Sequence, residues 1–172
     1  MRIKMSDTRF PRNLFFAIFT AGILQCVHDL PLLPNRLASH FAASGMANGW
    51  MTKSQFFITY IVVILPSIAL EFWMPSRITK KSGAGLNLPN KEYWLAPERR
   101  TETLAYFKGF FSWYGCAFLL LEVFAMGMAL RANFAVPARL PVIPIASAIV
   151  AFVVFNIAGV IAMYRRFSKP QQ

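Results

Sequence analysis

Four long apolar runs, separated by polar segments, dominate the pattern of the chain. The runs cover residues 14–33, 56–74, 104–130 and 141–164. A helix needs about 20 residues to cross a bilayer core about 30 Å thick, and each run reaches or nearly reaches that length. No linker or internal repeat divides the runs, so we predict one membrane domain over residues 1–172. Its expected fold is all-α, an integral membrane four-helix bundle.

Lys and Arg are distributed unevenly over the polar segments, and this asymmetry predicts the orientation of the helices. The N-terminal tail has four such residues, segment 75–103 has six and the C-terminal tail has three, whereas segments 34–55 and 131–140 have two each. Segments rich in Lys and Arg stay in the cytoplasm. We therefore expect both termini inside (N-in/C-in), with an outer loop over 34–55 and a cytoplasmic loop over 75–103. The four residues of the N-terminal tail are Arg2, Lys4, Arg9 and Arg12.

Composition supports a membrane protein and argues against a nucleic-acid-binding one. Hydrophobic residues make up 56% of the chain and charged residues only 15%, although the net charge is +11; soluble domains carry about a quarter charged residues. The basic residues of the cytoplasmic loop are interrupted by Glu92, Glu98 and Glu102, so they form a poor nucleic-acid site. They suit instead the anionic head groups of the lipid bilayer at its cytoplasmic face. The expected lipid contacts are Lys80, Lys81, Arg99 and Arg100.

Ionisable residues within the predicted spans are costly in hydrocarbon, so each needs a partner or a function. Glu71 and Lys108 lie near the inner ends of their spans, where we expect either an ion pair between them or a Lys108 side chain that extends to the membrane surface. Asp29 and Glu122, together with His28, lie nearer the outer side. Two interpretations of this outer group stay open: structural polar packing, or a site for a ligand, a proton or a metal ion.

Two prolines predict features of the second and third helices. Pro66 predicts a kink in the second span, because proline lacks an N–H and clashes with the preceding turn. Pro97 fits the first position of a helix. The third helix is therefore predicted to begin there, well before the membrane.

No combination of residues predicts catalysis or a cofactor. The chain has two His residues and lacks Ser-His-Asp, HExxH, P-loop and GxGxxG arrangements, so we expect no enzyme and no cofactor. The weak metal candidates are His28, Asp29, His40 and Glu122. Zinc would need the outer loop to fold back over the helices to bring them together. The simpler expectation is that His40 hydrogen-bonds to a helix end, with Trp50 as an interfacial anchor.

The outer loop carries a motif. It follows a Leu30-Pro31 turn at the end of the first run. Its residues are His40, Phe41, Gly45, Gly49, Trp50 and Lys53. This outer motif resembles the signature of a bacterial domain of unknown function that forms the N-terminal part of SdpI-type toxin immunity proteins. Where that family commonly has Pro, Asn and Asp, this chain has Ala38, Ala42 and Asn48.

The cytoplasmic loop carries a second stretch that resembles short members of the same family. Its residues are Asn87, Pro89, Asn90, Lys91, Tyr93, Trp94 and Pro97. With this inner motif, the resemblance spans about residues 14–130. The further helices and second domain of SdpI-type proteins have no counterpart in this sequence, and we expect the immunity and repressor-sequestering roles to belong to that part.

The resemblance implies a small binding or interaction protein of the bacterial cytoplasmic (inner) membrane. It would be an SdpI-like immunity or sensing module, or an accessory subunit of a membrane complex. Its outer loop would receive a protein partner or a peptide toxin. The alternative is a minimal ion- or proton-linked transporter that uses Asp29 and Glu122. Four helices would then need a homo-oligomer to enclose a path.

Overall fold

Long helices dominate the computed structural model, which is 72% helical and describes residues 7–169. Arg2 and Lys4 of the N-terminal tail lie outside the described residues. In chain order the elements are α1 (Arg9–Asp29), the 3-10 turn η1 (Leu30–Leu32), β1 (Arg36–Phe41), β2 (Ala47–Thr52), α2 (Lys53–Val63), α3 (Leu65–Ile68), the π-helical turn η2 (Ala69–Trp73), α4 (Met74–Lys80), α5 (Lys91–Trp94), α6 (Pro97–Ala132) and α7 (Val142–Phe167).

Four helical stretches are long and apolar enough to cross a membrane, as predicted, so this is a multi-pass membrane protein. They are Arg9–Leu32, Lys53–Lys80, Pro97–Ala132 and Val142–Phe167. Helical hydrogen bonding continues past the apolar runs because polar residues at the helix ends can reach water. The third stretch has 36 residues. It is therefore about 54 Å long at about 1.5 Å per residue, well beyond the hydrocarbon thickness.

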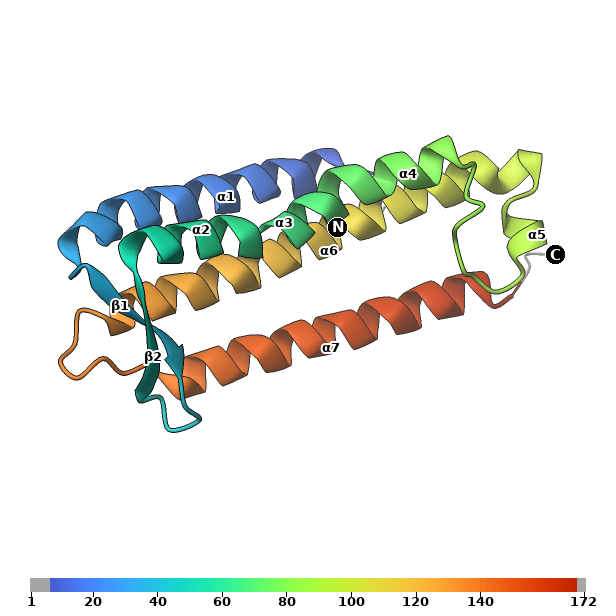
Figure 1. Ribbon diagram of the computed structural model, residues 1–172. Coiled ribbons are helices and arrows are strands. Elements are labelled where there is room, and N and C mark those ends of the chain that lie inside the picture. The colour runs from blue at the N-terminus through green and yellow to red at the C-terminus, as the bar shows by residue number, and fades with distance from the viewer. Residues whose placement is uncertain (1–6, 170–172) are drawn as a thin grey trace.

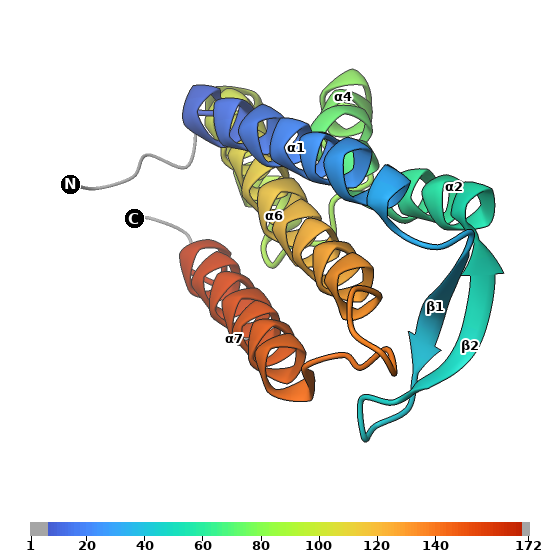
Figure 2. The same cartoon turned by 90° about the vertical axis from the view of Figure 1, so that its left-hand side faces the viewer.

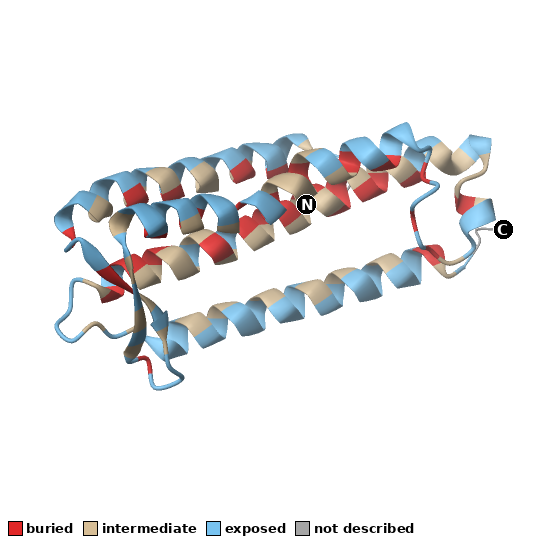
Figure 3. Ribbon diagram, in the orientation of Figure 1, coloured by how far each residue is buried: buried red, intermediate tan, exposed pale blue. Residues whose placement is uncertain are grey.

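Buried hydrophobic residues form two clusters, and the cluster nearer the hairpin is formed mainly by three of the four spans, whereas the other includes Phe167 of α7. The stretches α1, α2–α4 and α6 lie side by side, whereas α7 stands on the other side of α6 (Figures 1 and 2). The side chains of Phe15, Tyr60 and Leu119 are fully buried where the three spans meet. In α7 the single described buried residue is Phe167, at its end (Figure 3). The predicted four-helix bundle is thus a three-helix core with a fourth helix against α6.

The second span is interrupted at Pro66, in agreement with the kink predicted there. Helix α2 ends at Val63 and α3 begins at Leu65, and a π-helical turn follows directly. The Ser67 hydroxyl donates to the carbonyl oxygen of Ile64 at 2.7 Å, inside the break. Extra polar backbone is tolerated within a span when side chains satisfy it in this way. The interruption places Glu71 on the π-helical turn.

The all-α prediction was wrong for the outer loop. Strands β1 and β2 form an antiparallel hairpin, with Arg36 opposite Thr52 and Ala38 opposite Trp50. The hairpin closes one end of the bundle beside the α6–α7 connection (Figures 1 and 2). An extended segment must find partners for its backbone N–H and C=O groups, and pairing with itself provides them. The chain therefore contains a small two-stranded sheet.

Candidate functional site

The hairpin is joined to the end of α6 through one side chain, Asn133. Its amide oxygen accepts a hydrogen bond from the N–H of Ala38 at 2.6 Å, and its amide nitrogen donates to the carbonyl oxygen of Ala38 at 3.0 Å. The same nitrogen donates to the carbonyl oxygen of Ala129 at 2.8 Å. The Asn133 amide thus pairs with β1 much as a neighbouring strand would. Sequence analysis missed this residue, although Asn just after a helix is a recognised end signal.

The hairpin turn is held against the α6–α7 connection by Gly45. This residue has φ +81°, a conformation that favours glycine. Its N–H donates to the carbonyl oxygen of Ala42 at 2.8 Å, and its own carbonyl oxygen accepts from the N–H of Leu140 at 2.8 Å. A Cβ atom at Gly45 would also collide with the carbonyl oxygen of Leu140. Both the backbone conformation and the close contact therefore require glycine at this position of the outer motif.

Lys53 ties the hairpin to the end of the first span. Its ammonium group donates to the carbonyl oxygen of Pro31 at 3.1 Å, so the last residue of the outer motif reaches the Leu-Pro turn that precedes it. Thr52 and Gln55 form a reciprocal capping box at the start of α2. We predicted that His40 would make the bond to a helix end. That prediction was wrong: Lys53 makes it, and the His40 ring has no hydrogen bond among the described residues.

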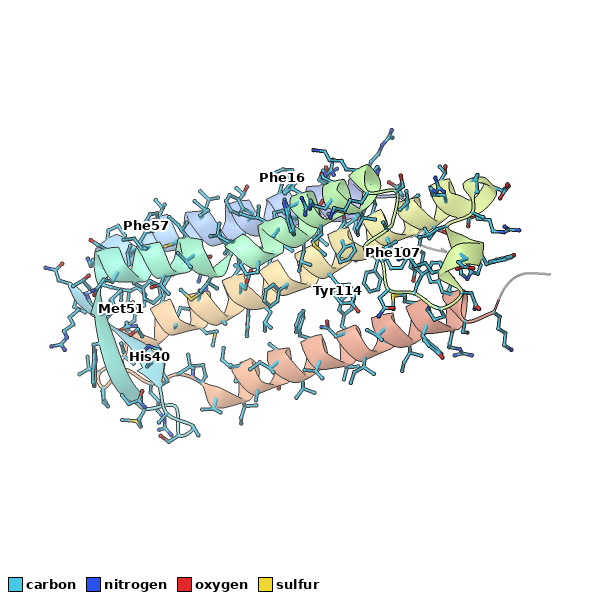
Figure 4. All side chains as sticks on the ribbon, turned by 45° about the vertical axis from the view of Figure 1, so that its right-hand side comes forward. Phe16, His40, Met51, Phe57, Phe107 and Tyr114 are labelled. Carbon is cyan, nitrogen blue, oxygen red and sulfur yellow. The ribbon has the colours of Figure 1, made fainter. Side chains whose placement is uncertain are left out.

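The hairpin leaves several large side chains on the surface. Trp50 is 52% exposed, Met46 and His40 are exposed, and Phe41 is half-buried. His40 lies well away from the helix core (Figure 4). Exposed Trp and Met side chains on a rigid element are typical of surfaces that bind another molecule. The outer motif thus contains residues that hold the hairpin in place, such as Gly45 and Lys53, and residues that stay exposed on its surface.

The inner motif supports the far end of α7. Asn90 has φ +51° and donates from its amide nitrogen to the carbonyl oxygens of Phe167 at 3.2 Å and Ser168 at 2.9 Å. Trp94 donates from its indole nitrogen to the same Phe167 oxygen at 2.9 Å, and its ring packs edge-on against the Phe167 ring. The last carbonyls of a helix have no partner within it. Asn90 and Trp94 provide that partner for α7.

The rest of the inner motif also stabilises the local chain. Lys91 donates to the carbonyl oxygen of Ala84 at 2.7 Å, and the guanidinium of Arg99 lies 4.0 Å from the centre of the Tyr93 ring. Pro97 is the first residue of α6, as predicted. The two remaining members, Asn87 and Pro89, lie in the connection between α4 and α5. The residues of the inner motif that make contacts in the described structure bind other parts of the same chain, which argues for a structural role of this motif.

Glu71 is fully buried, and its ion pair differs from the predicted one. Its Oε1 atom lies 3.4 Å from Nε of Arg12, in the first turn of α1. Lys108, the predicted partner, lines the same cavity as Glu71 but is not its ion-pair partner in the described residues. Glu71 and Lys108 therefore lie at a similar depth, as expected, but they do not form the predicted ion pair with each other.

The outer group of ionisable residues is not brought together. His28 and Asp29 pair at 2.8 Å at the end of α1. Glu122 is buried in the core near Tyr60, and each has a side-chain oxygen without a hydrogen-bond partner in the described chain. Helix α1 packs against this part of the core at Gly22, where a Cβ atom would contact Tyr60 and Val123. Asp29 lies seven residues further along α1. That spacing is about 10 Å along the helix, which separates Asp29 from Glu122.

The weak metal candidates do not form a metal site. Over residues 7–169, no group of three or more His, Cys, Asp or Glu side chains is placed to hold a metal ion. His40 lies on the hairpin, whereas Glu122 lies within the helix core. The candidates for a functional site are therefore the exposed hairpin surface and the buried charges of the bundle.

Comparison of the chain with protein-family models, with curated proteins and with solved structures finds no match. The resemblance to the SdpI-type domain stays a prediction. The function of this membrane protein is therefore best inferred from the geometry of the hairpin and of the buried charges.

Proposed function

We propose that this protein is a small integral-membrane binding protein of the bacterial cytoplasmic membrane, which recognises a protein or peptide through the β1–β2 hairpin. It would act as an SdpI-like immunity or sensing module, or as an accessory subunit of a membrane complex. The observation that supports the proposal is the rigid attachment of an exposed hairpin. Asn133 and Leu140 bond to its backbone and Lys53 ties its base to the Leu-Pro turn, while Trp50 and Met46 stay exposed.

Rigid attachment matters because binding costs less when the recognition element is already ordered. Immobilising a flexible loop costs conformational entropy for each residue that becomes fixed. The hairpin has its backbone bonds formed before any partner arrives. An exposed Trp on such an element can bury a large apolar area while losing little side-chain entropy.

The proposal includes the N-in/C-in orientation, which places the hairpin outside the cytoplasm. Cysteine labelling tests it, since the native Cys26 and Cys116 are both buried and free. Ser44 in the hairpin turn and Ser82 after α4 are both exposed, so each is a suitable site for a new cysteine. A membrane-impermeant maleimide should label Ser44→Cys in intact cells and Ser82→Cys only after lysis. The reverse pattern would overturn the orientation.

Binding by the hairpin is tested with two matched tryptophans. Trp50 is 52% exposed on β2, and Trp73 is 55% exposed on η2, nearer the opposite end of the second span. The tagged protein is purified in mild detergent from its native membrane, and stoichiometric companions are identified by mass spectrometry. Trp50→Ala should reduce recovery of the partner at least about tenfold, the loss expected for a tryptophan hot spot. Trp73→Ala should leave it unchanged.

Recovery of a constant partner that resists Trp50→Ala but is lost in Trp73→Ala would overturn the assignment to the hairpin. A photo-crosslinking residue in place of Met46 gives an independent readout, because crosslinking requires contact. The crosslinked species should disappear when Trp50→Ala is combined with it.

One buried group favours a second candidate function, the ion- or proton-linked carrier. Glu122 has a carboxylate oxygen without a partner in the described core, and the Tyr60 hydroxyl beside it is also unsatisfied. Buried unsatisfied polar groups within spans often mark proton or ion paths. In proteoliposomes, Glu122→Gln should abolish any proton flux that the wild-type protein supports. Flux that persists in Glu122→Gln, or its absence from the wild type, would overturn the carrier.

A further inference from the structure

A polar cavity of about 560 Å³ lies between the start of α1, the η2–α4 segment and α6. It is bordered by the first turn of α1 and the last turn of α4, which lie away from the hairpin (Figure 1). Arg12 is in that first turn and Lys80 is the last residue of α4. Helix ends lie at the level of lipid head groups in a bilayer. The cavity therefore opens where head groups are found.

The cavity carries an excess of positive charge. Arg12, Lys80 and Lys108 line it, against the single carboxylate of Glu71. Arg12 is paired with Glu71, but neither Lys80 nor Lys108 forms an ion pair with a carboxylate among residues 7–169. Two ammonium groups from different helices thus line one space, and neither has an ion-pair partner of its own among the described residues. A phosphate group is the anion that such a pair of lysines suits best.

Glu71 adds a second requirement for the ligand. Its side chain is 0% exposed, and its Oε2 atom has no hydrogen-bond partner within the described structure. Its Oε1 atom has the long 3.4 Å contact with Arg12, and the buried Ser112 side chain also interacts with the carboxyl group. A buried carboxylate oxygen without a donor is unfavourable, because its lost hydration is not replaced. A ligand that donates from an amine or hydroxyl would satisfy it.

The backbone at Glu71 is specialised as well. The residue sits on the π-helical turn Ala69–Trp73, and such turns are rare and often found at functional sites. The neighbouring span approaches closely here: a Cβ at Gly115 would lie 3.2 Å from both the Glu71 nitrogen and the Ser67 carbonyl oxygen. The carboxylate is therefore held in place by backbone packing and lines the cavity.

We propose that this cavity binds the polar head group of a membrane phospholipid, one that has both a phosphate and a hydrogen-bond donor. Lys80 and Lys108 contact the phosphate, and Glu71 accepts a hydrogen bond from the amine or hydroxyl at the end of the head group. Phosphatidylethanolamine and phosphatidylglycerol have this chemistry. Phosphatidylcholine has a phosphate but no donor. The site is independent of the hairpin and of its proposed partner.

The test measures equilibrium binding of short-chain lipids to the purified full chain in detergent. The probes are the dihexanoyl forms of phosphatidylethanolamine, phosphatidylglycerol and phosphatidylcholine. We expect at least one of the first two to bind at least fivefold more tightly than phosphatidylcholine. Equal affinity for the three lipids would overturn the role of Glu71. Glycerol phosphate and inorganic phosphate are added as competitors, to separate a lipid source from a soluble phosphate.

Neighbouring lysines supply a matched control. Lys80 lines the cavity, and the exposed Lys81 does not. Lys80→Gln and Lys108→Gln should each weaken binding of the preferred lipid about tenfold, and Lys81→Gln should leave it unchanged. Equal weakening in Lys80→Gln and Lys81→Gln would show diffuse attraction by surface charge and overturn the site.

A third variant addresses the donor. Glu71→Gln keeps the size of the side chain and should reduce the preference over phosphatidylcholine to about one. If a Glu71→Gln variant keeps the wild-type helicity and elution volume and still prefers the lipid over phosphatidylcholine, the proposed contact with Glu71 is overturned. Full competition by glycerol phosphate would overturn the lipid as the source, while supporting a phosphate site.

Discussion

His40 and Gly49 lie directly opposite each other in the hairpin, and the imidazole occupies the space that a side chain at position 49 would fill. A Cβ atom at Gly49 would be 3.0 Å from the His40 Cβ and 3.1 Å from its Cδ2. The pairing also has an irregular register next to His40. These two members of the outer motif therefore form one structural unit, in which glycine determines where the imidazole lies.

Gly49→Ala should displace the His40 ring, because the added methyl group would lie closer to the ring than an ordinary contact distance. We expect changed ring chemical shifts for His40 in an NMR spectrum of histidine-labelled protein. The chain has only two His residues, so His28 is an internal reference. Gly85→Ala is the matched control, since a Cβ there would meet nothing within 4 Å. Identical His40 shifts in Gly49→Ala and wild type would contradict this packing.

Asn133→Ala should loosen the hairpin from α6. The change removes three hydrogen bonds and leaves the backbone groups of Ala38 without partners. The expected loss in the free energy of unfolding is about 1–3 kcal/mol, the cost of leaving buried polar groups unsatisfied. Hydrogen exchange of the Ala38 amide should speed up. The control is Asn156→Ala in α7, which removes a bond within one helix and should leave exchange in β1 unchanged.

Trp94→Phe should destabilise the end of α7 while keeping an aromatic ring in place. It removes the bond from the indole nitrogen to the Phe167 carbonyl oxygen, worth about 0.5–1.5 kcal/mol. Hydrogen exchange should accelerate at residues 164–168. Trp73→Phe is the comparison, because the exposed Trp73 has no hydrogen bond within the described chain. Unchanged exchange in Trp94→Phe would argue against the role of the inner motif in holding α7.

Gly115→Ala should destabilise the helix core more than Gly127→Ala. At Gly115 a methyl group meets backbone atoms of the second span at 3.2 Å, and backbone there cannot move without shifting two helices. Overpacking of this kind costs about 1–3 kcal/mol. At Gly127 the added methyl meets the flexible Gln25 amide, which can rotate away. Thermal unfolding in detergent should therefore show the larger decrease for Gly115→Ala, and the opposite order would contradict the close approach at η2.

Sequence alone predicted the features that depend on neighbouring residues. The four spans were identified because membrane crossing depends on the apolar character of about 20 consecutive residues. The break at Pro66 and the start of α6 at Pro97 follow from the missing N–H and fixed φ of proline. The similar depth of Glu71 and Lys108 follows from counting residues along a helix.

Contacts between distant residues could not be predicted in the same way. The hairpin depends on Asn133, which is 95 residues from Ala38, and on Leu140 in the connection before α7. The partner of Glu71 depends on rotation about the helix axis, and the π-helical turn changes that rotation locally. Nothing in the apolar runs indicated that α7 would stand outside the three-helix core.

The sequence by itself therefore determined how many times the chain crosses the membrane and where its helices break. Those properties are set by local hydropathy and backbone chemistry. Only the tertiary structure decided which charges share the cavity at Glu71 and which motif residues face each other. The physical reason is that close packing fixes the angle and register of each helix and strand, and packing is decided by all of the elements together.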